Sequence, residues 1–248
     1  MKSFLVQKQL KANKYSFYCN AERRYPKDLS KLASFINEPE FPFQFKSFLY
    51  SKRHPNRPLP EDINLRVKFT GKIQVYHSAV VRFYAPSDLC GPSGMYRQRI
   101  RCNLLWHGQC RHDTVFVAQD TDEAGMAGML IARVHLLFSF RDDEDLNDSN
   151  STPEYLRCAL VSWFIPSSVG ERDPDTNMWV VKPEGSPTQR PVQVIPLKSI
   201  ARGAHLLPHY GFGHLPDYIT HHNALDKFKE YFVNPYIDHH CHEFLAEY

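Results

Sequence analysis

Three arginines at alternate positions of one predicted strand are the residues of this sequence best suited to binding an anion. They are Arg97, Arg99 and Arg101, in the run MYRQRIRC at positions 95–102. Side chains alternate between the two faces of an extended strand, so these three project together, about 6.6 Å apart, while the residues between them point the other way. Guanidinium groups bind phosphates bidentately, and successive phosphates along one nucleic-acid strand have a similar spacing. The pattern predicts a phosphate-binding strip. Further candidates for the same interface are Lys72, Arg111 and His112.

The overall charge adds nothing to this interpretation, because 30 Lys and Arg against 27 Asp and Glu leave a net charge of only +3. Any attraction for nucleic acid must come from local patches. In an alternative interpretation the strand faces solvent, and its arginines pair with acids of the segments 120–123 or 141–154. The acidic segment 141–154 lacks the Gly and Glu that an EF-hand loop needs at its sixth and twelfth positions, so it predicts a solvated hairpin loop.

A second cluster of possible ligands, DHHCHE, occupies positions 238–243. His239, Cys241 and His242 offer the nitrogen and sulfur donors that zinc accepts. Adjacent residues cannot all turn to one ion, so a site would need partners such as Cys110 and His112. A second well-formed ligand pair is missing, so we predict neither a metal site nor a cofactor. A zinc-dependent enzyme stays an alternative.

Aromatic residues on the predicted strands and loops suggest a third kind of site. They could form a cage for a methylated lysine or a platform for a nucleic-acid base. The candidates are Tyr84, Tyr96, Trp106, Trp163 and Trp179. More often such residues belong to the core, which is the expectation for Trp163 between apolar neighbours.

Several function classes lack their signatures. The sequence has no GxSxG, no HExxH and no GxxxxGK[ST] motif, so no enzyme is predicted. It has no run of about 18 apolar residues, and its polar first residues do not resemble a signal peptide. The six cysteines include no CxxC pair. We therefore expect an intracellular protein with free thiols and no membrane partner.

These candidate residues need a scaffold, which begins with helices. The segment 27–37 places Leu29, Leu32, Phe35 and Ile36 at helical spacing, and a second helix is expected at 42–51. The proline-rich stretch 54–62 is typical of a linker. We therefore divide the chain into a helical arm with its linker, 1–62, and a β-rich body with a short helical C-terminal tail, 63–248.

From Lys72 the hydrophobic period becomes two, which predicts a half-buried strand over 72–84 with Val81 and Phe83 on its buried face. Further strands are predicted at 114–118, 130–140, 155–164, 178–181, 192–197 and near 205–210. Val134, Leu136 and Phe138 are expected on one buried face. Turns, not helices, separate these strands. The fold class is therefore α+β, mainly β: an antiparallel β-barrel or strongly bent sheet.

Several blocks of the sequence resemble, in order and spacing, the C-terminal region of Plavaka-type transposases of fungal DNA transposable elements. The resemblance covers about residues 40–245. The blocks include FTGKIQVYHSAVVRFYAPSDLCGPSGMYRQRIRCNLLWHG (69–108), RHDTVFVAQDTDEAGMAGMLIARVHLLFSF (111–140), RCALVSWF (157–164), DPDTNMWVVKPE (173–184), VIPLKSIARGAHLLPHYG (194–211) and YFVNPYIDHHCHEF (231–244). Asn177 departs from the family, which tends to have Gly there, and the 141–154 insertion is longer than usual.

The resemblance implies that strand-transfer chemistry resides in an RNase H-like domain upstream, whose three carboxylates hold two metal ions. This chain would then be a non-catalytic accessory part of a nuclear protein. Three functions compete. The first is a transposase-derived module that contacts DNA or a transposase partner through the arginine strip. The second is a β-barrel protein-interaction or chromatin-reader module with an aromatic pocket. The third is a zinc-dependent enzyme near His239 and His242.

Overall fold

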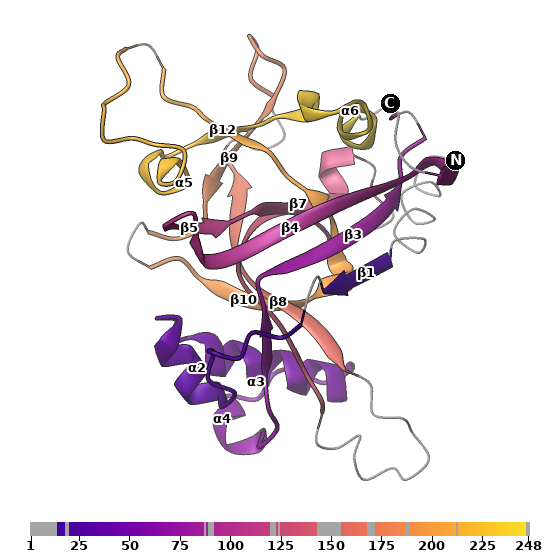
Figure 1. Ribbon diagram of the computed structural model, residues 1–248, viewed down its shortest axis with the longest axis vertical. Coiled ribbons are helices and arrows are strands. Elements are labelled where there is room, and N and C mark those ends of the chain that lie inside the picture. The colour runs from indigo at the N-terminus through magenta and orange to yellow at the C-terminus, as the bar shows by residue number, and fades with distance from the viewer. Residues whose placement is uncertain are drawn as a thin grey trace.

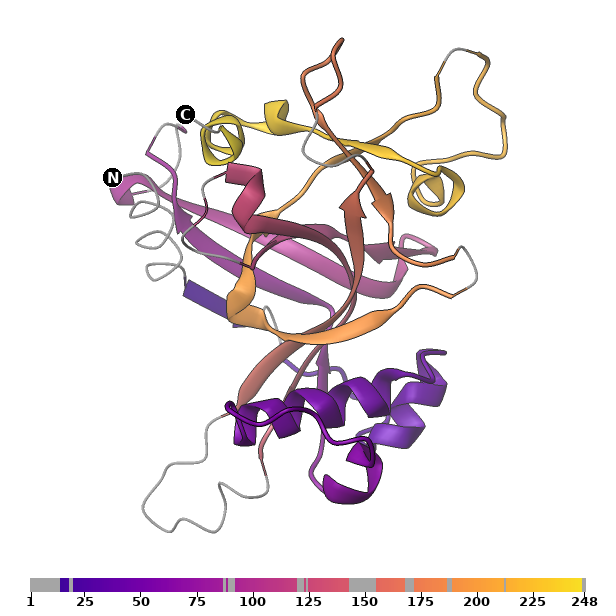
Figure 2. The same cartoon turned by 180° about the vertical axis from the view of Figure 1, so that it is seen from behind.

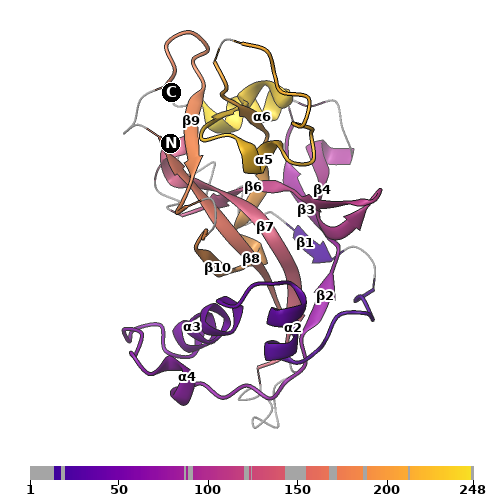
Figure 3. The same cartoon turned by 90° about the vertical axis from the view of Figure 1, so that its left-hand side faces the viewer.

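The computed structural model describes residues 14–17, 20–86, 88, 92–119, 123, 125–142, 155–167, 172–186, 189–211 and 213–246. Two antiparallel sheets and a layer of helices contain most of the regular structure (Figure 1). The helices α2 to α4 lie at one end of the long strands, and the C-terminal helices α5 and α6 lie at the opposite end (Figure 3). Within these residues, no helix has the length and apolar character needed to cross a membrane.

The N-terminal helices are α2 (Leu29–Phe35), α3 (Phe41–Arg53) and α4 (Ile63–Arg66), and the first two occupy the segments predicted to be helical. Asp28 caps α2 by accepting a hydrogen bond from the Lys31 backbone N–H at 2.9 Å. In α3 the spacing of four buries Phe41, Phe45 and Leu49 on one face. Phe43, on another face of α3, is exposed.

The smaller sheet holds the arginine strand. It has four strands in the order β1-β3-β4-β5: β1 (Lys14–Phe17), β3 (Ser78–Tyr84), β4 (Met95–Trp106) and β5 (Gln109–His112). Along β4, Ile100 and Cys102 are buried in a cluster with Ala79, Val81 and Phe83 of β3. This buried face fixes which side of β4 remains for the arginines.

The larger sheet has nine strands. Its main order is β11-β6-β7-β8-β9-β13-β12, with β2 also paired to β7 and β10 to β8. The bounds are β2 (Gln74–Tyr76), β6 (Thr114–Ala118), β7 (Met129–Phe140), β8 (Leu156–Pro166), β9 (Trp179–Pro183), β10 (Val192–Pro196), β11 (Ile200–Gly203), β12 (Leu206–Pro208) and β13 (Tyr231–Val233). The strands β11 and β13 were not predicted from the sequence.

The predicted strand 72–84 is two strands, so that prediction is wrong in one respect. The chain leaves the large sheet after β2 and enters the small sheet at β3, with His77 between them. The hydrophobic period continues across the break, since Val75, Val81 and Phe83 are all buried. The two halves nevertheless face different clusters, Val75 beside the helices and Val81 between the sheets.

The large sheet is strongly curled, as the view from behind shows (Figure 2). The pairing of β7 with β8 shifts register between Val134 and Leu136, which is the signature of a β-bulge. A bulge bends its strand and increases the local twist. It also places Val134 in the cluster between the sheets and Leu136 in the cluster beneath the helices, and not on one shared face. The predicted fold class, a mainly β α+β fold with a strongly bent antiparallel sheet, is confirmed.

The helices and the large sheet share one buried cluster, in which Phe45 of α3 lies 4.6 Å, centroid to centroid, from Phe140 of β7. Arg53, at the end of α3, donates to the buried Asp142 carboxylate, with Nε 3.2 Å from Oδ2. Asp142 therefore fastens the helical layer to the end of β7. Residues 143–154 of the acidic segment lie outside the described residues.

The buried position of Leu136 leads to a stability prediction. Its side chain is 3% exposed. Truncation to Ala removes buried methyl groups and leaves a cavity, so Leu136→Ala should lower the free energy of unfolding by about 2 to 4 kcal/mol. Urea denaturation measures this loss. The matched control is Leu105→Ala, whose side chain is 60% exposed and which should cost under about 0.5 kcal/mol. A similarly small loss of unfolding free energy for Leu136→Ala would show that Leu136 does not lie on the buried face of β7.

Candidate nucleic-acid interface

The three arginines of β4 share one face of the small sheet. In the antiparallel register Arg97, Arg99 and Arg101 stand opposite Arg82, Val80 and Ser78 of β3. Arg97 is exposed, and Arg99 and Arg101 are partly exposed. The register therefore places the three arginines on one face of β4, as the alternation predicted.

A tight hairpin places a fourth arginine beside them. His107 and Gly108 connect β4 to β5 with positive φ values of 50° and 85°. Two such residues are typical of a type I′ turn, whose twist matches that of the flanking strands. The turn returns the chain so that Arg111 pairs with Asn103 of β4. Arg111 and Arg101 consequently lie on the same face of the sheet.

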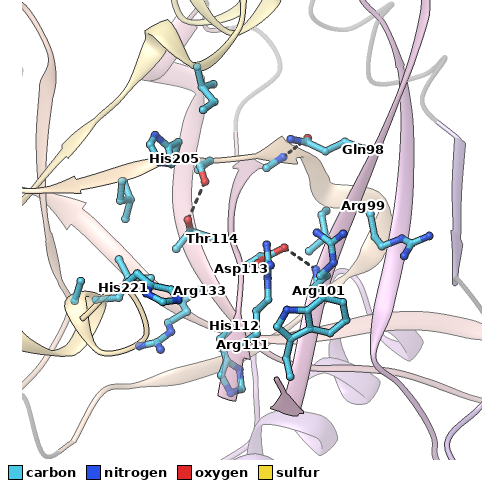
Figure 4. A pocket seen from close by; sticks show the side chains of 18 of the residues that line it. Gln98, Arg99, Arg101, Arg111, His112, Asp113, Thr114, Arg133, His205 and His221 are labelled. Atoms are coloured by element: carbon cyan, nitrogen blue, oxygen red, sulfur yellow. Dashed lines mark hydrogen bonds and ion pairs between the residues drawn. The ribbon is translucent and has the colours of Figure 1, made fainter. Parts of the chain in front are cut away.

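These residues line a cleft of about 1020 Å³. Its walls come from β4 and β5 on one side, and from β7, β11, β12 and the segment around α5 (Ala224–Lys227) on the other (Figure 4). Five arginines line it: Arg97, Arg99, Arg101, Arg111 and Arg133. Among the described residues of the lining, Asp113 is the one carboxylate. Arg133 is paired with Asp226 of α5, and Gln98, the residue between Arg97 and Arg99, reaches the far wall by accepting a hydrogen bond from the Gly203 backbone N–H at 2.7 Å. The excess of arginine therefore lies on the β4–β5 wall, in a chain of nearly balanced charge.

Asp113 organises the arginines of the first wall. Its Oδ1 accepts a hydrogen bond from Arg111 Nε at 2.8 Å, and its Oδ2 accepts one from the backbone N–H of Arg101, also at 2.8 Å. The carboxylate thus holds Arg111 against β4 at the point where the chain passes from the small sheet to the large one. Asp113 is thus a partner shared by Arg101 and Arg111.

Arg101 is the most constrained of the strip. Its Nε is buried without a hydrogen-bond partner among the described residues. Burial, followed by the neighbouring charge of Arg111, lowers the pKa of Arg101. The guanidinium nevertheless stays charged at neutral pH, because an arginine pKa is far above 7. A buried donor beside a like charge would be stabilised by an incoming anion.

Arg133 is a residue of the site that was not predicted from the sequence. It lies on β7 within the apolar run LIARVHLLFSF, and its side chain is 11% exposed. Its Nη1 donates to Asp226 Oδ1 of α5 at 2.6 Å. Arg190 approaches the same carboxylate at 3.5 Å. The one sequence signal that could have predicted this role is the presence of a charged residue within an apolar strand. Its partner Asp226 could not be predicted, because it lies 93 positions away in the sequence.

His112 belongs to the cleft but is not a cation at neutral pH. Its Nδ1 lies 2.8 Å from the carbonyl oxygen of Val134 and donates to it. Burial lowers the pKa of His112, with the backbone hydrogen bond acting in the opposite direction. The side chain therefore joins β5 to β7, and its neutral ring supplies no cation for a phosphate.

Lys72 lies outside the cleft. It is exposed just before β2, on the part of the chain that pairs with β7 near the helical layer. The break at His77 explains this, because residues before it belong to the other sheet.

Of the aromatic residues considered for a cage, Tyr96 and Trp106 line the arginine cleft, and Trp163 and Trp179 lie elsewhere. Tyr96 stacks on Phe83 with ring centroids 5.4 Å apart, and Trp163 donates through Nε1 to Gln193 at 2.9 Å. Trp179 lines a separate pocket of about 200 Å³ with Tyr236, but the Arg172 guanidinium already lies 5.2 Å from its ring centroid. Trp106 lines the arginine cleft.

The histidine-rich C-terminal segment forms the helix α6 (His239–Leu245). Asp238 caps it by accepting from the Cys241 backbone N–H at 2.6 Å. Helical geometry turns the candidate ligands apart: Cys241 is buried, His239 is exposed, and His242 stacks on Tyr236. Over the described part of the chain, no three His, Cys, Asp or Glu side chains lie together as a metal site would require. Cys110 and His112 line the arginine cleft instead.

A buried histidine, His240, and a partly buried one, His135, lead to a pH prediction. Burial lowers the pKa of His240 to about 4 and that of His135 to about 3. Both folded-state values lie below the unfolded value of about 6.5, so between these pH values the unfolded chain binds more protons. Stability should therefore be complete above about pH 6.5 and fall as the pH drops. Urea denaturation at pH 7.0 and pH 4.5 should show a loss of at least about 2 kcal/mol. Equal stability at the two pH values would contradict the buried, neutral state of these side chains.

A comparison of the chain with protein-family models, with curated proteins and with solved structures gave no match, so its function is inferred from the cleft itself.

Proposed function

We propose that this chain is a nucleic-acid-contacting module, a non-catalytic accessory domain derived from a transposase, and that the arginine cleft is its DNA-binding surface. The observation that supports it is the arginine content of the cleft: four arginines of β4 and β5 line it together with Asp113, while the fifth, Arg133, is paired with Asp226. The chain as a whole has a net charge of +3, so this concentration of positive charge is local.

The chemistry of the cleft favours the sugar-phosphate backbone over base edges. Arginines on alternate positions of a strand present donors at a regular interval, which matches a repeating polyanion. Contacts of this kind position a nucleic acid and carry no direct sequence information. The resemblance of the sequence to transposase C-terminal regions agrees with such a role, in which sequence recognition and strand transfer belong to other parts of the machinery.

The reader and zinc alternatives have less support. The pocket at Trp179 is small, about 200 Å³, and Trp179 itself packs against the cluster near the C-terminus. The side chains of α6 diverge, and burial raises the pKa of the Cys241 thiol to about 11, so it is not a ready thiolate ligand. Neither feature is as strong an indication of a ligand site as the arginines that line the cleft.

The proposal is tested by fluorescence anisotropy with labelled 20-base-pair duplexes of two unrelated sequences. At low salt both should bind with similar affinity, and added salt should release both, because phosphate contacts release counterions. Strong discrimination between the two sequences would indicate base readout and contradict the backbone mode. Absence of binding at low salt would overturn the proposal and favour a protein-interaction module.

A further inference from the structure

Trp106 stands apart from the other tryptophans. Trp163 packs against the cluster between the sheets, and Trp179 packs against the cluster near the C-terminus. None of the three buried clusters of the described residues includes Trp106. Its partly exposed side chain lines the arginine cleft. Since an indole contributes most to stability when it is packed in a core, this position suggests a binding role.

The hairpin fixes where this indole lies. Trp106 is the last residue of β4 and pairs with Gln109 across the two-residue turn. Its ring centroid lies 5.4 Å from Cζ of Arg101 and 5.8 Å from Cζ of Arg111. Both guanidinium groups lie over the ring, so an aromatic surface and two cations stand together at the end of the arginine strip.

This combination fits an unpaired nucleic-acid strand. In a duplex the bases are stacked inside and only the backbone is outside, so arginines can reach the phosphates but an indole cannot reach a base face. In a single strand the bases can be splayed out and stacked on aromatic side chains while a basic groove follows the backbone. Phosphates beside a base stacked on Trp106 would lie next to Arg101 and Arg111.

We propose that Trp106 stacks on an unpaired base and gives the cleft a preference for single-stranded over double-stranded DNA. The inference rests on the proposed function and deepens it by naming the form of DNA. Loss of one stacked base by alanine substitution typically weakens binding by about 5- to 150-fold. Trp106→Ala should show a loss of this size with single strands and less than about a threefold change with duplex.

The experiment compares three labelled 20-mers: a single strand of thymidines, a duplex, and a single strand of abasic sites, which keeps the phosphates but has no bases. The wild-type protein should bind the thymidine strand most tightly. Trp106→Ala should bind the thymidine strand and the abasic strand with equal affinity, because its advantage for bases is gone. Trp106→Phe, which keeps a ring, should retain most of the difference.

A second measurement does not depend on the Ala variant folding. The thymidine strand should quench tryptophan emission of the wild-type protein, and the quenching should be lost in Trp106→Phe, which retains Trp163 and Trp179. Duplex preference in the wild type, or equal losses for all three 20-mers in Trp106→Ala, would overturn the inference and leave the phosphate-binding proposal standing. No binding of any 20-mer would overturn the proposed function itself.

Discussion

Replacing Arg97, Arg99 and Arg101 together by Gln should weaken the binding of duplex DNA by roughly two to three orders of magnitude at 0.1 M salt. Each neutralised phosphate contributes about 0.9 to the slope of log affinity against log salt, so each lost contact removes nearly one order of magnitude at that concentration. The side chains leave the face opposite the buried Ile100 and Cys102, so the fold should persist. Anisotropy titration measures the affinity, and urea denaturation checks the fold.

A charge-matched control separates the strip from net charge. Arg23, Arg57 and Arg66 are exposed, and none of them lines the cleft as the described residues define it. Changing all three to Gln alters the net charge by the same amount and should weaken binding by less than about fivefold, because charges far from the ligand are screened within about a Debye length. Equal losses in the two triple variants would mean that only the overall charge matters.

Arg202→Leu should cost about 3 to 5 kcal/mol of unfolding free energy, the largest stability effect expected from one substitution here. Arg202 on β11 is 1% exposed, and its Nη1 lies 2.8 Å from His240 Nδ1. Its Nη2 donates to Asp238, and its guanidinium lies 5.2 Å from the ring centroid of Phe83. The residue therefore ties α6 to both sheets, and its loss leaves the Asp238 carboxylate without its charged partner.

The double variant Arg202→Leu with Asp238→Asn distinguishes a lost charge pair from lost packing. Removing both charges is less costly than removing one, because no uncompensated carboxylate remains. The double variant should therefore recover part of the stability in urea denaturation. A loss under about 1 kcal/mol in the single variant would contradict the structural role of this arginine.

The hydrophobic pattern was enough to predict most of the scaffold, for physical reasons that particular elements show. The period of two in 130–140 and the helical spacing around Leu32 both reflect local geometry, which the residue order determines. The break at His77 could not be predicted, since the same alternation continues on both sides of it. Only the pairing partners, β7 for β2 and β4 for β3, show that the chain changes sheet.

Only one wall of the cleft, the one formed by β4 and β5, could be predicted from the sequence. Arg97, Arg99 and Arg101 follow each other on one strand, so alternation alone predicts a shared face. The second wall depends on long-range packing, as in the pairing of Arg133 with Asp226 from 93 residues further along the chain. Similarly, nothing local in the sequence indicates that Arg202 is buried.

The salt dependence of duplex binding tests the central claim most directly. If Arg97, Arg99 and Arg101 each neutralise a phosphate, the slope of log affinity against log salt should be about −2.7 or steeper for the wild-type protein. The slope of the triple Gln variant should be shallower by roughly two to three units, because the term of each lost contact disappears. Identical slopes for the two proteins would contradict the assignment of the arginine cleft as the DNA-binding surface.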